Sequence, residues 1–153
     1  MSYISAFNSS EDKKRNLASK IYDISESVTK FFWDDAPRLG IQQREGQQDM
    51  AFDVLDAIKS GSHVVIEAGV GIGKSFAYLV PILLYNAKTF SPVVIATSTI
   101  ALQEQLLSDV ERLKKWLRIE PDPILAKGRT TIFASDARVS IFSLLTAVLS
   151  SRS

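Results

Sequence analysis

Apolar residues recur at alternating spacings of four and three along the first part of the chain. They are Leu17, Ile21, Ile24, Val28 and Phe31. This spacing predicts a long amphipathic helix that begins near Ser9 or Ser10 and ends near Pro37, because proline disfavours helix in the residue before it. A stripe of this kind packs more often on its own domain than on a partner helix, and we expect it to do so here.

Two further stretches have the same helical periodicity. The first covers residues 44–59 and ends at Gly61, a residue type that tolerates the left-handed conformation of a helix cap. The second begins at Thr97-Ser98-Thr99, whose hydroxyl groups can cap a helix N-terminus. Its buried face is predicted to comprise Leu106, Val110, Leu113 and Leu117.

Short apolar runs at residues 64–66, 93–96 and 124–126 are candidate β-strands. Between the first two lies a helical stretch of about residues 74–86, which contains Pro81 and should kink there. A strand, a helix and a strand in this order predict a right-handed crossover between parallel strands. The expected fold class is therefore α/β, with parallel strands preceded by helices.

The composition is that of one globular domain, with 153 residues of which 46% are hydrophobic and 23% are charged. A formal net charge of +1 means that any nucleic-acid surface must be local. The absence of cysteine excludes disulfides and thiolate metal sites. No apolar run is long enough to span a membrane and the first ten residues lack a signal-peptide pattern, so we expect a cytoplasmic protein.

One basic cluster lies on and after the helix that ends near residue 117. Its members are Arg112, Lys114, Lys115, Arg118, Lys127 and Arg129. Such a cluster can follow a phosphate backbone, and a solvated helix face explains it equally well.

The clearest functional signal is a glycine-rich segment between the apolar run 64–66 and the helix that follows. It consists of Ala68, Gly69, Val70, Gly71, Ile72, Gly73, Lys74 and Ser75, with alanine where the commonest form of the motif begins with glycine. Such a turn directs backbone N–H groups and the positive end of a helix dipole at one point, where a triphosphate fits. Lys74 would contact the outer phosphates, and the Ser75 hydroxyl would ligate Mg²⁺.

Four segments in this order resemble the beginning of a DinG-type superfamily 2 helicase, a family that is also similar to the XPD helicases. They are Arg44-x-x-Gln47-x-x-Met50, the glycine-rich segment with Tyr78 and Pro81 after it, Thr97-Ser98-Thr99-Ile100-Ala101-Leu102-Gln103-Glu104-Gln105-Leu106, and Ala126-Lys127-Gly128-Arg129. The resemblance covers approximately residues 35–129. It implies a helical segment at 1–36, the first part of a RecA-like ATP-binding domain at 37–129, and a tail at 130–153 outside the family pattern.

The resemblance implies a site for ATP and Mg²⁺. Arg44 and Gln47 would lie near the adenine, and residues 68–75 would surround the phosphates. Lys74 would be the catalytic cation, and Ser75 would be the protein ligand of Mg²⁺.

For the whole protein the resemblance implies ATP-driven unwinding of DNA in the 5′-to-3′ direction. Thr97, Thr99 and Gln103 would face single-stranded DNA. Val70 and Ile72 stand where the family often has threonine or another small residue. We expect little effect from that difference, because backbone amides hold the phosphates. The sequence gives no indication of the oligomeric state.

Hydrolysis of ATP requires a second acidic motif, of the Asp-Glu-x-His kind, and none follows Arg129. The second RecA-like domain, with its arginine, is not in the sequence either. We therefore expect this chain to bind nucleotide at best, as an N-terminal fragment of a helicase. The alternative is a non-catalytic remnant that binds nucleotide or DNA, or has no function of its own. A small P-loop kinase is disfavoured, because no acceptor-substrate acid or lid arginines follow the loop at recognisable positions.

The tail departs from the family pattern immediately after Arg129. The family usually continues Ser/Asn-Asn-Tyr-x-Cys, whereas residues 130–137 are Thr-Thr-Ile-Phe-Ala-Ser-Asp-Ala. One nucleotide string encodes Asn-Asn-Tyr-Phe-Cys-Leu-Gly-Arg, and the same string without its first base encodes the residues found here. We therefore expect that a single-base loss truncated the helicase frame, which sequencing the gene would test. The alternative is a genuine, divergent tail, whose apolar residues 141–149 would form a helix over the sheet or expose an aggregation-prone surface.

Overall fold

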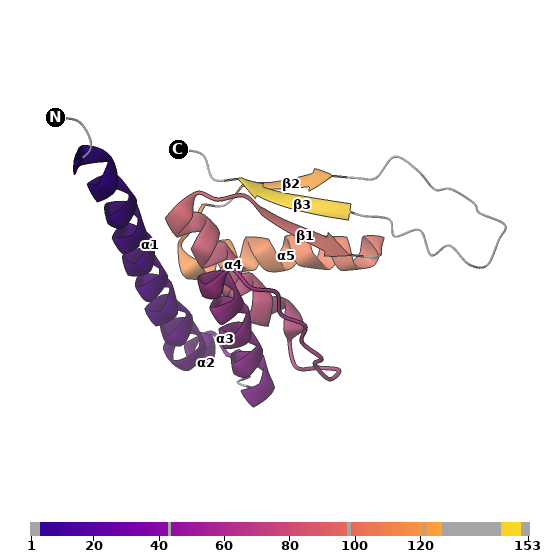
Figure 1. The fold of residues 1–153 in the computed structure, drawn as a ribbon. Coiled ribbons are helices and arrows are strands. Elements are labelled where there is room, and N and C mark those ends of the chain that lie inside the picture. The colour runs from indigo at the N-terminus through magenta and orange to yellow at the C-terminus, as the bar shows by residue number, and fades with distance from the viewer. Residues whose placement is uncertain (1–3, 43, 98, 121, 127–144, 151–153) are drawn as a thin grey trace.

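The computed structural model of the protein describes residues 4–42, 44–97, 99–120, 122–126 and 145–150. The described helices are α1 (Ile4–Lys30), the π-helical turn η1 (Phe31–Asp35), α2 (Ala36–Arg38), α3 (Glu45–Ser60), α4 (Lys74–Thr89) and α5 (Ile100–Leu117). The described strands are β1 (Val93–Thr97), β2 (Asp122–Ala126) and β3 (Leu145–Ser150). Figure 1 shows the strands on one side of the molecule and α3, α4 and α5 on the other, with the N-terminal part of α1 projecting away.

The predicted N-terminal helix is confirmed as α1, although it begins earlier than the serines at positions 9 and 10. Ile24, Val28 and Phe31 of its apolar stripe are buried. Pro37 does not end the helical path, because it lies in the first turn of α2, where a missing N–H group costs little. Just before it, the Ala36 N–H donates to the Phe31 carbonyl, which is the wider bonding pattern of a π-turn.

Helix α4 lies at the centre of the hydrophobic core. Leu79, Val80 and Leu83 are fully buried, and the helix contacts α1, α3 and α5. In its last turn, the buried side chain of Asn86 donates from Nδ2 to the carbonyl of Ser91 beyond the helix at 2.8 Å, which ties the helix to the segment leading into β1. None of the described helices is both long enough and apolar enough to cross a bilayer.

The two other predicted helices are confirmed as α3 and α5. Gly61 caps α3 with φ of +62°, and its N–H bonds to the Ala57 carbonyl. Thr99 caps α5, where its Oγ1 accepts a hydrogen bond from the Leu102 N–H at 3.2 Å. On the predicted inner face of α5, Leu106, Val110 and Leu113 are buried and Leu117 is half-buried.

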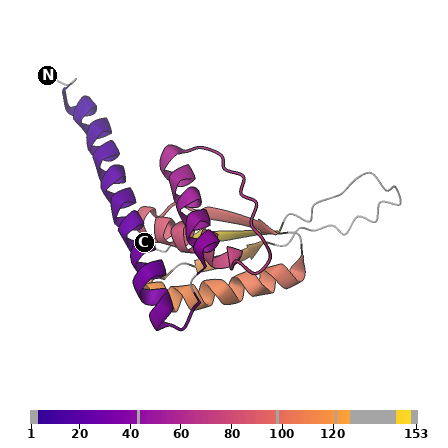
Figure 2. The ribbon, with the colours of Figure 1, turned by 90° about the horizontal axis from the view of Figure 1, so that it is seen from below.

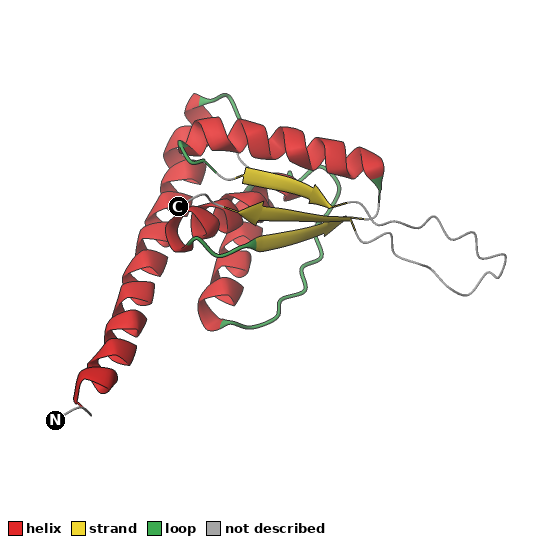
Figure 3. Ribbon diagram, turned by 90° about the horizontal axis from the view of Figure 1, so that it is seen from above, coloured by secondary structure: helices red, strands yellow, loops and turns green. Residues whose placement is uncertain are grey.

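The strands predicted at residues 93–96 and 124–126 are confirmed as β1 and β2, but parallel pairing is not. The sheet has the order β1-β3-β2 (Figure 3), and β3 is antiparallel to both neighbours. The register pairs Val93 with Leu149 and Asp122 with Ser150. β1 and β2 therefore run in the same direction without being adjacent, because a strand from the tail lies between them. The helix considered for residues 141–149 is wrong for the described part of that stretch, which forms β3.

The strand expected at residues 64–66 is not formed. These residues belong to an extended loop on the outside of the helices between α3 and α4 (Figure 2). The Val65 side chain is 99% exposed and that of Val64 is 45% exposed, so the run is not buried as a strand core would be. An apolar run becomes a strand only where a neighbouring strand offers its N–H and C=O groups. The predicted crossover from residues 64–66 to β1 is therefore absent from the described structure.

Substituting Leu83 with alanine should destabilise the fold by about 2–5 kcal/mol, because it opens a cavity in the fully buried face of α4. The free energy of unfolding, measured by urea titration with circular dichroism, tests this. Tyr22→Ala is the control, because Tyr22 is 66% exposed on α1 and should change the stability far less. Equal effects of the two substitutions would contradict the central position of α4.

Candidate nucleotide-binding site

The glycine-rich segment ends at the N-terminus of α4, as the sequence predicts. Gly71 and Gly73 have φ values of +84° and +80°, a region that other residues rarely adopt. Gly73 is the N-cap residue of α4, and its carbonyl accepts hydrogen bonds from the N–H groups of Phe76 at 3.1 Å and Ala77 at 3.3 Å. The segment therefore turns sharply into the helix, where the helix dipole favours a negative charge.

Gln47 connects the first turn of α3 to this loop. Its Nε2 donates to the Gly73 carbonyl at 2.8 Å, and the residue is only 4% exposed. The amide nitrogen of Gln47, predicted to lie near the adenine, is thus occupied by the backbone of the phosphate loop. A Cβ atom added to Gly73 would overlap this same nitrogen. Gln47 and Gly73 therefore fit together only because Gly73 has no side chain.

Two more contacts join α3 to the loop. The Cδ1 atom of Ile72 lies 3.6 Å from the position that a Cβ atom would take on Gly46 and 3.5 Å from the equivalent position on Gly69. The Nη1 atom of Arg44 lies 3.6 Å from the Cβ position of Gly71. The structure thus brings Arg44 and Gln47 to the loop together. The motif varies at position 72, so the sequence could not predict that Ile72 contacts α3 and helps to hold the loop there.

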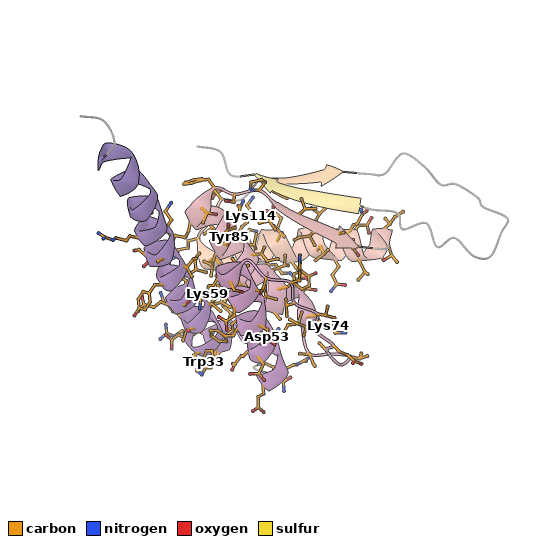
Figure 4. All side chains as sticks on the ribbon, viewed as in Figure 1. Trp33, Asp53, Lys59, Lys74, Tyr85 and Lys114 are labelled. Carbon is orange, nitrogen blue, oxygen red and sulfur yellow. The ribbon has the colours of Figure 1, made fainter. Side chains whose placement is uncertain are left out.

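Lys74 and Ser75 follow at the start of α4. Lys74 is exposed and forms no ion pair within the described residues, and Figure 4 shows it apart from Lys59 and Trp33. Ser75 is half-buried, whereas Val70 at the tip of the loop is fully exposed. An unpaired cation beside a helix N-terminus and a serine hydroxyl suit the phosphates of a nucleotide and its Mg²⁺. The residues present therefore fit the expected cofactors.

Two ionisable groups near Ser75 have raised pKa values. Burial raises the pKa of Asp109 on α5 and outweighs the effects of Arg112, Ser75 and Gln105, which lower that pKa. Burial also raises the pKa of the Tyr78 hydroxyl on α4, which Ser75 lowers and the charge of Asp109 raises further. Helical spacing could have indicated the Ser75–Tyr78 and Gln105–Asp109 pairs, but not that Asp109 of α5 lies near Ser75 of α4.

A cavity of about 420 Å³ joins Ser75 to the end of β1. Its polar lining includes Ser75, Tyr78, Thr97 and Gln105, and its apolar lining includes Ile82. Thr97, predicted to face DNA, thus shares a cavity with the residue predicted to ligate Mg²⁺.

The other residues predicted to face DNA lie farther along the chain. Thr99 is exposed and caps α5. Gln103 is only 5% exposed, and its buried Nε2 atom has no hydrogen-bond partner in the described structure. Lys127 and Arg129 of the basic cluster lie outside the described residues. The structure therefore exposes Thr99 and buries Gln103.

A glycine-rich loop at a helix N-terminus, followed by lysine and serine, defines the class of P-loop nucleotide-binding proteins. The sequence model of the DEAD/DEAH box helicase family matches residues 46–141. The chain belongs to this family, which implies a RecA-like fold. The matched range runs past Arg129, and the proposed frameshift stays a prediction.

Individual relatives agree with this assignment. The chain is 41% identical over 111 residues to an ATP-dependent helicase DinG of Mycobacterium tuberculosis, and 42% identical over 92 residues to the ATP-dependent DNA helicase YoaA of Escherichia coli. A 3'-5' exonuclease DinG of Bacillus subtilis is 42% identical over 69 residues. The resemblance to DinG-type helicases is confirmed.

The three alignments cover 69%, 60% and 45% of this chain. They cover only 17%, 14% and 7% of the respective relatives, so the chain corresponds to a small part of each. No solved structure matches the chain.

Replacing Gly73 with alanine should destabilise the protein by about 1–2 kcal/mol from backbone strain, and further because the new methyl group displaces Gln47. Gly61→Ala is the matched control, because Gly61 also has a positive φ but nothing lies within 4 Å of its Cβ position. Urea unfolding of both variants separates the overlap from the strain. If Gly73→Ala lowers the free energy of unfolding no more than Gly61→Ala does, the result would contradict the Gln47 contact.

Proposed function

We propose that this chain is the ATP-binding part of an ATP-dependent DNA helicase, and that the whole protein unwinds DNA. The observation that carries the proposal is the phosphate loop itself, in which Gly71 and Gly73 turn the chain into α4 and the exposed Lys74 ammonium has no acidic partner among the described residues. The names of the relatives in Mycobacterium tuberculosis and Escherichia coli support the same activity.

Each part of the loop has a role in the proposed site. The loop backbone of residues 68–75 would hold the phosphates, and Lys74 would contact the outer ones. Ser75 would be the protein ligand of Mg²⁺, an ion that neutralises phosphate charge when it is bound. Arg44 would contribute its guanidinium on the side of the loop that faces α3, where its Nη1 lies beside Gly71.

Gln47 would act on the nucleotide in two ways. Its Nε2 supports the Gly73 carbonyl and so maintains the shape of the loop. Its Oε1 is still an acceptor that could bind the adenine, but only after the surroundings of this buried residue open. We propose single-stranded DNA as the second ligand, near Thr97 and Thr99 at the end of β1. The cavity shared by Thr97 and Ser75 would place the two ligands on adjacent sides of the same strand end. Gln103 would contact DNA only after α5 or its surroundings rearrange, because it is buried here.

Lys74→Ala should weaken the binding of a fluorescent ATP analogue about 10- to 100-fold, the loss expected for one charge-assisted contact with phosphate. Equilibrium titration in the presence of Mg²⁺ measures the dissociation constant. Lys59→Ala is the control, because Lys59 carries the same charge on α3 but pairs with Asp56 at 3.2 Å. Unchanged affinity in Lys74→Ala would contradict the proposed site.

The 153-residue chain should bind nucleotide without DNA-stimulated turnover, because its sequence contains no Asp-Glu-x-His motif to orient the attacking water. Phosphate release in the presence of single-stranded DNA measures this. Turnover that disappears in Lys74→Ala would contradict the expectation, since it would show a complete hydrolytic site.

A further inference from the structure

A second cavity, of about 530 Å³, lies where the C-terminal end of α5 meets the end of α1 and the short helix α2. Figure 2 shows α5 ending beside α1. This cavity has no lining residue in common with the cavity that joins Ser75 to Thr97. Its volume is within the range of roughly 300–1,000 Å³ that is usual for small-molecule sites. The proposed nucleotide site makes no use of it.

Positive charge dominates the lining of this second cavity. Its charged residues are one acid, Asp35, and four cations, Lys30, Arg38, Lys115 and Arg118. The four cations are exposed, and none of them belongs to an ion pair within the described residues. Four positive charges against one negative charge leave a net charge of +3 around the cavity.

The structure divides the basic cluster of the sequence into two kinds of cation. Arg112 and Lys114 each have an acidic partner about one turn away on α5, at 3.9 Å and 3.2 Å respectively. Lys115 and Arg118 have no such partner within the described residues and line the cavity. A solvated helix face explains the first pair, whereas the second pair faces cations from the other end of the sequence.

The electrostatics of the cavity favour an anion. Cations held around one cavity repel one another, and a bound anion removes this repulsion. The dipole of α5 adds about half a negative charge at its C-terminal end, which the net charge of the lining outweighs. Two of the four cations are arginines, whose planar guanidinium groups can each donate two hydrogen bonds to one phosphate.

An aromatic side chain in the same lining narrows the class of anion. Trp116 is half-buried, and its ring makes a T-shaped contact with the ring of Phe76 at a centroid distance of 5.8 Å. A nucleic-acid base can stack on an indole ring that is held in this way. Cations and an aromatic ring in one cavity therefore match the phosphate and the base of a single-stranded nucleic acid.

We propose that this cavity is a second contact site for single-stranded DNA, which takes a backbone phosphate among the four cations and a base against Trp116. The inference rests on the proposed function and extends it. The first proposed contact, at Thr97 and Thr99, lies at the other end of α5, about 27 Å away for a helix of 18 residues. The bound strand would thus contact both ends of the same helix.

Fluorescence anisotropy of a labelled oligothymidylate of about 20 nucleotides, titrated with the 153-residue chain, tests the proposal. The double variant Lys115→Gln with Arg118→Gly should bind about tenfold more weakly at low salt. The slope of log affinity against log salt concentration should fall by about 0.7 for each cation removed. Arg118→Gly should leave the fold intact, because Arg118 caps α5 with φ of +53°, a conformation that suits glycine. Urea unfolding of the variant checks this.

Two further sets of variants distinguish the cavity from a general effect of charge. Lys30→Gln and Arg38→Gln, on the opposite wall, should each weaken binding and lower the salt slope in the same way. Arg112→Gln with Lys114→Gln is the matched control, because it removes the same charge from α5 without changing the lining of the cavity. Equal losses in the control and in the cavity variants, or no loss in Lys30→Gln and Arg38→Gln, would overturn the proposal.

The emission of Trp116 gives a local readout. The chain has two tryptophans, so Trp33→Phe leaves Trp116 as the only one. Its fluorescence should be quenched as the oligonucleotide binds, and unchanged emission at saturation would overturn the stacking contact and the proposal with it. A labelled polyglutamate peptide is the alternative ligand. If the cavity variants lose affinity for this peptide and not for the oligonucleotide, the site takes an acidic protein segment and the proposal is wrong.

Binding of the fluorescent ATP analogue, measured on the same variants, separates this inference from the proposed function. The cavity variants should bind the analogue with unchanged affinity. If the wild-type chain binds the analogue but no oligonucleotide, or if the cavity variants bind the oligonucleotide as the wild type does, the second DNA contact fails and the nucleotide site stands. If the chain binds the oligonucleotide through the cavity but does not bind the analogue, the nucleotide site fails instead.

Discussion

The burial of α4 against α1, α3 and α5 is the constraint on which the rest of the structure depends. Its apolar residues are fully buried at Leu79, Val80 and Leu83, so the helix cannot shift without opening the core. Because the core holds the helix, its N-terminus is held as well, and the phosphate loop ends at a fixed point. The hydrogen bond from Gln47 to the Gly73 carbonyl then ties that point to α3. Rigid packing thus supports a loop that must itself be glycine-rich and exposed.

The same helix connects the proposed nucleotide side of the molecule with the proposed DNA side. Ser75 at its start shares a cavity with Thr97 at the end of β1 and with Gln105 on α5. The cavity therefore lies between the start of α4 and the helix that follows β1. In a family of helicases, this arrangement places the proposed phosphate site beside the segment proposed to contact DNA.

The sheet shows how strand pairing depends on the partners that are present. β1 and β2 were predicted from local apolar runs and do run in one direction, but β3 from the tail lies between them and opposes both. Residues 64–66, an equally apolar run, have no strand partner in the described part of the chain, and Val65 remains exposed. Local pattern identifies a segment that can form a strand, whereas backbone hydrogen bonding decides whether and with which neighbour it does so.

The sequence by itself determined the helices and the phosphate loop of this protein, because both depend on local chemistry. Apolar spacing specified α1, α3 and α5, a threonine and a glycine specified their caps, and the glycines before Lys74 and Ser75 specified the loop. Only the tertiary structure decided that Gln47 supports the Gly73 carbonyl, that Ser75 and Thr97 share a cavity, and that Gln103 is buried. Each of these involves side chains whose burial or partners come from separate elements, and helical periodicity does not say how two helices are placed against each other.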